Sequence, residues 1–167
     1  MASDFCKIIL TDVYYGESQV SAAGLLIDKW EASTACQEFL YRAGQAEQYV
    51  PGEFYLRELP PLLQLLSPIP SFDCVVVDAH VWLQKDRPGC GYYLWKSLNK
   101  KVPVIGVAKN AFHLGIAKPL FRGTSRKPLY VSSVGIEVET AVAHIAQMHG
   151  SYRIPTLLKQ VDHLSRK

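Results

Sequence analysis

Apolar positions near the start of the chain follow the two-residue period of β-strands. Residues 5–14 and 19–28 run apolar or alternate with polar positions, and Gly16-Glu17-Ser18 between them is a typical turn sequence. Residues 34–42 carry a weaker version of the same pattern. Together, these segments predict an antiparallel meander with Asp12 on its first strand.

Short apolar runs then alternate with segments of helical spacing. Strands are expected at 74–78, 102–107 and 129–131, and helices at 53–66, 91–100, 136–148 and after Pro155. Pro60-Pro61 is expected to kink or restart the first of these helices, because proline removes a helical hydrogen-bond donor. Residues 110–127 have no clear period and are rich in Gly, Pro and basic residues, so we interpret them as a surface loop.

The order of these elements predicts the fold class. A meander followed by β–α–β units gives a mixed sheet with helices on both faces. We therefore expect an α/β fold with the ribonuclease H-like arrangement, in which carboxylates from separate elements meet at one edge of the sheet. The length of 167 residues and the apolar fraction of 49% fit one globular domain spanning residues 1–167.

Composition excludes several classes of protein. No apolar run reaches membrane-spanning length, and the N-terminus has no signal-peptide pattern. The four cysteines show no CxxC spacing, which argues against a zinc site or a redox motif. We expect reduced thiols, a cytoplasmic location and no membrane partner.

Two aspartates lie where apolar runs end. Residues 73–80, Asp-Cys-Val-Val-Val-Asp-Ala-His, predict a strand buried on both faces that ends at Asp78. Residues 7–12 form a similar run that ends in Asp12. Ligands of α/β sheets bind beyond the carboxyl ends of strands, and a carboxylate there is costly to bury alone. The two aspartates therefore suggest one shared metal site.

Glu58 and Asp162 complete the set of candidate acids. Carboxylates brought close together repel one another unless a cation neutralises them. Oxygen ligands with few histidines favour Mg²⁺, or Mn²⁺ in its place, over zinc. Such an ion activates a water molecule and stabilises a leaving oxygen. The alternative for each acid is a solvated position or an ordinary ion pair.

The net charge of +3 conceals an uneven distribution. Between Arg87 and Ile136 the chain has no acid, and all 15 acids lie outside this basic segment. Its nine basic residues are Arg87, Lys96, Lys100, Lys101, Lys109, Lys118, Arg122, Arg126 and Lys127. One basic segment beside acidic strand ends favours a polyanionic partner drawn toward a metal site. The alternative is a solvated basic surface with no partner.

Several short motifs occur in a fixed order along the chain. They are Tyr49-Val50-Pro51-Gly52, Phe54-x-x-Arg57-Glu58-x-Pro60, Val77-Asp78-Ala79-His80, Pro103-Val104-Ile105-Gly106-Val107-Ala108-Lys109, Leu129-Tyr130-Val131-Ser132, Glu139-Thr140-Ala141-Val142 and Gly150-Ser151-Tyr152-Arg153-Ile154-Pro155. Their order and spacing, over residues 5–163, resemble the endonuclease V family, which cleaves nucleic acid near deoxyinosine or inosine.

The resemblance implies a catalytic set. Asp12, Glu58 and Asp78 would be the metal-binding acids. Asp162, seven residues after Pro155, falls where the family has an Asp or His near the site, and His163 is the alternative if the alignment shifts by one position.

The resemblance also implies substrate contacts. Lys109 would lie beside the scissile phosphate, where an ammonium offsets developing charge, or else be a surface lysine. The loop around Tyr49 would be a wedge that fills the gap left by a displaced base, since a tyrosine ring can stack on bases. His80 would contact the flipped base or a phosphate, or be a loop histidine. The predicted substrate-binding residues are Tyr49, Pro51, Gly52, His80 and Gly106.

The chain departs from the family pattern near Asp78. Ala79 and Val81 replace two glycines, and Gln84 lies where the family has a histidine. The segment after Lys109 is shortened, and we expect a short variant without the family's N-terminal helix. Glycine loss bears on which base is accepted, because the backbone there must approach the base closely.

We therefore expect a Mg²⁺-dependent endonuclease. It would flip a hypoxanthine nucleotide out of the strand and cut a phosphodiester on its 3′ side. The predicted partner is inosine-containing DNA or RNA, bound by a monomer. One alternative is a nucleic-acid-binding protein of the same fold that has lost efficient cleavage. The other is a nuclease of this fold with a different base or structure preference.

Overall fold

The computed structural model describes residues 7–44, 51 and 55–167. The strands are β1 (Ile8–Tyr15), β2 (Val20–Ile27), β3 (Gln37–Ala43), β4 (Cys74–Val77), β5 (Trp82–Gln84), β6 (Arg87–Pro88), β7 (Val104–Ala108), β8 (Lys118–Leu120) and β9 (Leu129–Val134). The helices are α1 (Tyr55–Leu66), α2 (Cys90–Ser97), α3 (Val138–Gln147) and α4 (Thr156–Ser165). None of the described helices is long and apolar enough to cross a membrane.

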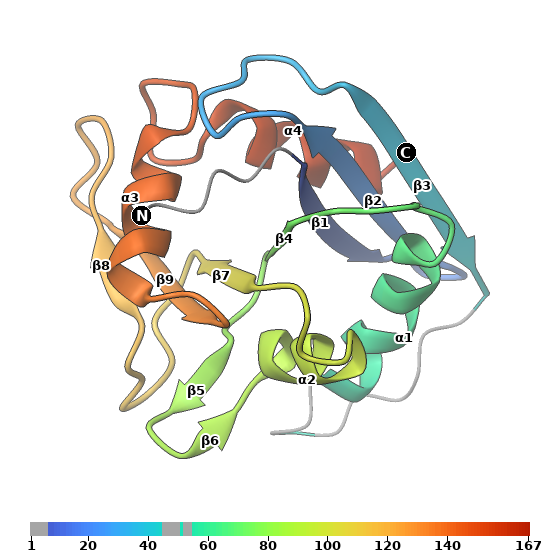
Figure 1. Ribbon diagram of the computed structural model, residues 1–167, viewed down its shortest axis with the longest axis horizontal. Helices are drawn as coiled ribbons and strands as arrows, with labels where there is room; N and C mark the ends of the chain where they lie inside the picture. The colour runs from blue at the N-terminus through green and yellow to red at the C-terminus, as the bar shows by residue number, and fades with distance from the viewer. Residues whose placement is uncertain (1–6, 45–50, 52–54) are drawn as a thin grey trace.

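Seven of the described strands form one mixed sheet in the order β3-β2-β1-β4-β7-β9-β8 (Figure 1). β1, β2 and β3 are the predicted antiparallel meander. β1, β4 and β7 run parallel to one another, and β9 and β8 complete the sheet in antiparallel pairs. The predicted α/β, ribonuclease H-like class of fold is confirmed.

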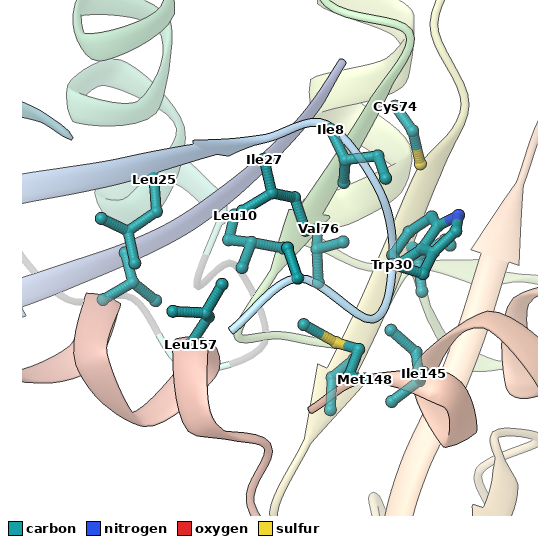
Figure 2. Packing of buried hydrophobic residues seen from close by; sticks show 14 of the residues in the cluster. Ile8, Leu10, Leu25, Ile27, Trp30, Cys74, Val76, Ile145, Met148 and Leu157 are labelled. Atoms are coloured by element: carbon teal, nitrogen blue, oxygen red, sulfur yellow. The ribbon is translucent and has the colours of Figure 1, made fainter. Parts of the chain in front are cut away.

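Alternation along the central strands builds a core on each face of the sheet. Ile8 and Leu10 of β1 face the layer formed by α3 and α4, in the same cluster as Ile145 of α3 and Leu157 of α4 (Figure 2). Ile9 points to the other face, into the cluster that includes Leu62 of α1. Because successive strand residues point to opposite faces, an unbroken apolar run is what a strand covered on both sides requires.

Helix α1 differs from the prediction in one respect. It is one continuous helix with Pro60 and Pro61 inside it, so the chain does not restart the helix there, and a kink stays a prediction. The prolines lie in the second turn, and their missing N–H groups affect only the carbonyls of two first-turn residues. Burial of Leu62 and Leu66 against the sheet outweighs this local loss.

Residues 110–127 contain more regular structure than predicted. β8 pairs with β9 at the edge of the sheet, so the interpretation of the whole segment as a surface loop is wrong. β5 and β6 form a separate hairpin that the sequence pattern did not reveal. Strands of two or three residues are too short to show a hydrophobic period.

Candidate active site

The carboxyl ends of three parallel strands bring the candidate residues together. Asp12 lies in the second half of β1, Asp78 directly follows β4, and Lys109 directly follows β7. Glu58 in α1 and Asp162 in α4 belong to helices on opposite faces of the sheet. The fold therefore gathers the five predicted catalytic residues at one edge of the sheet, from both of its faces.

Asp12 and Asp162 form a hydrogen-bonded pair of carboxyl groups. Asp12 is only 6% exposed. Burial, then the charge of Asp78 and the hydrogen bond to Asp162, raise the pKa of Asp12 from 3.8 to about 8. Burial acts to raise the pKa of Asp162 too, but the hydrogen bond from Asp12 and the charge of Lys109 help to lower it. Of the two alternatives for the fourth group, Asp162 contacts the acids, whereas His163 is exposed on α4.

Glu58 approaches the site from the other face. It is buried in the first turn of α1 and accepts a hydrogen bond from the Tyr15 hydroxyl. Burial raises the pKa of Glu58 to about 8, with the Tyr15 bond opposing and the charge of Asp78 adding to the shift. The Arg57 guanidinium lies 3.9 Å from the centre of the Tyr15 ring. Sequence reasoning missed Tyr15. Tyr15 lies three residues after Asp12 on β1, and strand residues an odd number of positions apart point to opposite faces, so the Tyr15 side chain lies on the α1 face.

Asp78 connects these two groups of acids. Its Oδ2 lies 3.6 Å from the Lys109 Nζ, and 35% of its side chain is exposed. Burial raises the pKa of Asp78, and the Lys109 ammonium opposes this rise. The Asp78 charge acts on both Asp12 and Glu58, so it occupies the middle of the cluster.

The chemistry of these side chains fits a hard divalent cation. All of them offer carboxylate oxygens. Burial raises the pKa values of Asp12 and Glu58 to about 8, so a bound cation would favour their ionised forms. A cavity of about 30 Å³ between Asp12, Asp78 and Lys109 has room for a water molecule or a small ion. In the part of the chain that the structure describes, no three Asp, Glu, His or Cys side chains converge closely enough to hold a metal. An ion would therefore have to draw the acids together.

A larger cavity of about 460 Å³, which we call the base cavity, shares Asp78 and Lys109 with the acid cluster. It is lined by Tyr55, Asp78, Ala79, His80, Leu83, Gly89, Cys90, Ala108, Lys109, Asn110 and Phe112. The Phe112 and His80 rings pack edge to face at 6.4 Å, and the Nε2 of His80 lies 2.9 Å from the carbonyl oxygen of Asn110. Apolar and aromatic walls with a few polar groups suit a flat heterocyclic base.

Gly106 shapes the base cavity through packing. A Cβ at this position in β7 would lie 2.3 Å from the Ala79 carbonyl oxygen and 3.0 Å from the Ser132 Oγ. The Ser132 Oγ also accepts a hydrogen bond of 2.9 Å from the Val81 N–H. Only glycine permits this close approach, so Gly106 and Ser132 together hold the 79–81 wall of the cavity.

Two predicted substrate-binding residues, Tyr49 and Gly52, lie outside the described residues. Pro51 between them is in an exposed turn. The wedge therefore stays a prediction. Gln84, which replaces the family's histidine, donates its side-chain amide to the His113 carbonyl at 2.9 Å and so holds the loop after β7.

Two arginines that sequence reasoning did not assign to the site form a rigid frame behind Lys109. Arg153 donates to the carbonyl oxygens of Lys109 and Pro128. Arg122 is only 7% exposed. Its guanidinium donates to carbonyl oxygens in the connection between α3 and α4, those of Met148, Gly150, Tyr152 and Arg153. Arg153 belongs to both networks, because its carbonyl oxygen accepts from Arg122 while its own guanidinium donates to the Lys109 carbonyl. The two networks together hold the Lys109 backbone in place.

The basic segment from Arg87 to Ile136 does not form one continuous surface. Lys100 and Lys101 precede β7, whereas Arg126 and Lys127 precede β9, which runs antiparallel to β7. The two pairs therefore lie at opposite ends of the strands. Of the two, Arg126 and Lys127 lie at the carboxyl ends of the parallel strands, where the acids are. Lys100 and Lys101 therefore do not face the same phosphates as Arg126 and Lys127, since the length of a strand separates the two pairs.

The mixed sheet with acids at the carboxyl ends of β1 and β4 defines the ribonuclease H-like class of fold. Within that class, the chain belongs to the endonuclease V family, because the family model described as Endonuclease V matches residues 5–122.

Individual relatives agree with this assignment. The chain is 31% identical over 142 residues to an endonuclease V of Streptomyces avermitilis, covering 71% of this chain and 61% of the relative. It is 28% identical over 186 residues to an endonuclease V of Streptomyces coelicolor, covering 96% and 78% of the two chains. The aligned region thus spans less than two-thirds of the length of the first relative.

Solved structures show the same fold. The crystal structure of the Streptomyces avermitilis endonuclease V superposes with a TM-score of 0.77 at 25% identity, covering 96% of this chain and 79% of that one. The Ciona intestinalis endonuclease V, solved with DNA containing an inosine followed by a ribo-adenosine, gives 0.83 at 19% identity, covering 98% and 86%. The second likeness is one of fold alone.

Proposed function

We propose that this protein is a metal-dependent endonuclease that cuts a phosphodiester bond on the 3′ side of a deoxyinosine or inosine nucleotide. The observation that supports this most strongly is the cluster of acids around Asp78, which contacts Lys109 and opens to the base cavity. Membership of the endonuclease V family supports the same activity. DNA repair and the processing of inosine-containing RNA are the two settings that such an activity would serve.

Mg²⁺ is the metal that an all-carboxylate donor set favours, with Mn²⁺ as a substitute. Asp12, Glu58 and Asp78 would hold it. When bound, the ion supplies an activated water molecule and charge stabilisation for the leaving oxygen. Its charge would also favour the ionised forms of Asp12 and Glu58, whose pKa values are about 8 without it.

The residues of the chain have distinct tasks in this proposal. The Lys109 side chain is 42% exposed and its ammonium lies 3.6 Å from Asp78, so it would contact the scissile phosphate and offset its developing charge. Arg153 holds the Lys109 carbonyl and so limits where that ammonium can go. The base cavity would receive the flipped base next to the bond that is cut.

Inosine is the base to test first, since the Ciona relative was solved with inosine-containing DNA. The experiment compares matched DNA and RNA strands that carry inosine, adenine or guanine at one position, with Mg²⁺, Mn²⁺ or EDTA. We expect cleavage on the 3′ side of inosine, with metal only. A Lys109→Met variant should lose most of this activity, whereas Lys118→Met on the exposed edge strand β8 should keep it.

Each other result contradicts a particular element of the proposal. Cleavage in EDTA would exclude metal dependence. Equal cleavage of all strands would indicate a nuclease of this fold with another base or structure preference. Tight binding of every strand without cleavage would indicate a nucleic-acid-binding protein.

A further inference from the structure

A second large cavity lies beyond Lys109, and we call it the exit groove. Its volume is about 720 Å³. It is lined by Lys109, Thr124, Ser125, Tyr152, Arg153, Ile154, Thr156, Leu158, Lys159, Asp162 and His163. Lys109 lines both this groove and the base cavity, but the other walls differ. The base cavity is bounded by residues of α1 and α2, and the exit groove by residues of α4 and the connection before it.

The charges of the exit groove suit phosphate groups. Lys159 and His163 are exposed and lie one helical turn apart on α4. Lys109 is at the end nearest the acids, and Asp162 is the single acid in the lining. Basic side chains along a groove that leads to a carboxylate cluster attract the backbone of a nucleic acid strand.

Tyr152 gives the exit groove an aromatic surface. This residue is 79% exposed. Its backbone is nevertheless fixed, because Arg122 donates to its carbonyl oxygen at 2.6 Å and to that of Gly150 at 3.0 Å. The loop around Gly123 packs closely on the same residues, since a Cβ there would lie 2.3 Å from the Ser151 carbonyl oxygen. A rigid backbone therefore presents an exposed aromatic ring at the groove.

We infer that the exit groove binds the single-stranded nucleotides that follow the cut bond, with one base stacked on Tyr152 and the backbone near Lys159. This inference rests on the proposed function. If the base cavity holds the flipped nucleotide and the bond on its 3′ side lies at Lys109, the exit groove is next along the strand, because it shares Lys109 with the base cavity and extends to the α4 side of the sheet. Stacking on an exposed ring requires an unpaired base, so the groove favours single strands of DNA or RNA over a duplex.

The test measures binding in EDTA, so that no strand is cut. The substrates are fluorescently labelled single strands with one inosine and the same sequence on its 5′ side. They differ only in the number of nucleotides on the 3′ side of the inosine. Deoxyribose and ribose versions are compared to distinguish DNA from RNA. Wild-type protein is compared with Tyr152→Ala and Tyr152→Phe, and with Phe121→Ala as the control. Phe121 is 62% exposed and close in sequence to the groove, but it is not in the lining.

Affinity for wild-type protein should rise as the 3′ flank lengthens and then level off. Tyr152→Ala should weaken the longer strands by about 5- to 150-fold and leave the shortest unchanged, while Tyr152→Phe retains the gain because its ring still stacks. Thermal melting of each variant shows whether it is folded. An affinity that does not change with flank length, or an equal loss with Phe121→Ala, would overturn the groove assignment and leave the proposed function intact. Failure of the wild-type protein to bind any strand would overturn both.

Discussion

Asp78 is the residue on which the geometry of the site converges. It lies between the Asp12–Asp162 pair on the α4 face and Glu58 on the α1 face, and it contacts Lys109 at 3.6 Å. A change here alters the interactions of every other candidate catalytic group. It is the most exposed of the four acids, at 35%, so among them its substitution disturbs the packing least.

Asp78→Asn should reduce cleavage by about 10³-fold or more while leaving folding and most strand binding unchanged. The reason is that a neutral amide is a poor metal ligand and no longer pairs with the Lys109 ammonium. Single-turnover rates on an inosine strand provide the measurement. Asp86→Asn, in the exposed turn between β5 and β6, is the matched control and should cleave at the wild-type rate. Near-wild-type turnover by Asp78→Asn would exclude Asp78 from the metal site.

The metal-free protein should become less stable as the pH rises from about 4 to about 8. The folded pKa of Asp12 is raised from 3.8 to about 8, so in this range the folded state holds a proton that the unfolded chain has released. Stability is therefore full below the unfolded pKa and is lost as the pH rises through the folded pKa. The shift of Glu58 has the same direction.

Asp12→Asn removes this penalty. In EDTA at pH 8, the variant should have an unfolding free energy higher than that of wild type by on the order of 1–2 kcal/mol, measured by urea denaturation. This difference should shrink toward pH 4. Added Mg²⁺ should stabilise wild type more than the variant. A wild-type unfolding free energy that does not fall between pH 5 and pH 8 in EDTA would contradict the raised pKa values.

At the scale of elements, one guanidinium donates to four carbonyl oxygens of the connection between α3 and α4. Arg122 lies in the loop after β8 and satisfies carbonyl oxygens from Met148 to Arg153. Those carbonyls belong to residues after the end of α3, and a cation near the C-terminal end of a helix interacts favourably with the helix dipole. The exposed loops on either side are thus joined through one buried side chain.

Arg122→Met should lower the unfolding free energy by about 3–5 kcal/mol. The methionine fills the space but leaves several partly buried carbonyl oxygens without a donor. Urea denaturation at neutral pH measures the loss. Lys118→Met, on the exposed face of β8, is the control and should change the stability by less than about 0.5 kcal/mol. An unchanged urea midpoint for Arg122→Met would show that water molecules donate to these carbonyl oxygens in place of the guanidinium.

At the scale of the whole molecule, the sheet separates charges that are close in the sequence. Lys100 and Lys101 lie at the edge of the sheet opposite the acids, while Arg126 and Lys127 lie at the edge that holds them. Ser125, directly before Arg126, lines the exit groove. A nucleic acid strand bound across the site should therefore contact Arg126 and Lys127 but not Lys100 and Lys101.

Binding of single strands should weaken with salt, and the two pairs should contribute unequally. Reversing Arg126 and Lys127 to Glu should reduce the slope of log affinity against log salt by about 1–2, since each lost phosphate contact removes about 0.7. Reversing Lys100 and Lys101, the same change in charge at the far edge, should leave the slope nearly unchanged. Equal effects of the two double variants would mean that the phosphates do not follow the acid edge.

Much of the fold could be predicted because the signals are local. The valines before Asp78 and the apolar run before Asp12 indicate strands buried on both faces, and a polar residue at the end of such a strand faces the ligand edge of an α/β sheet. Pro60 and Pro61 do not restart helix α1, since a local backbone penalty is outweighed by burial of Leu62 and Leu66. β8 gave no signal, because three residues at the edge of a sheet show no period.

The sequence by itself determined the longer strands, their order along the chain and the acids at the ends of β1 and β4, because the patterns that reveal them are local. It did not reveal the short strands β5, β6 and β8. The tertiary structure decided which distant groups meet. It paired Tyr15 with Glu58 and Asp162 with Asp12, and it left His163 exposed. One step along a helix rotates a side chain by about 100°, and one strand carries the chain across the whole sheet. Such placements follow from the packing of α1 and α4 on the sheet, which no local pattern specifies.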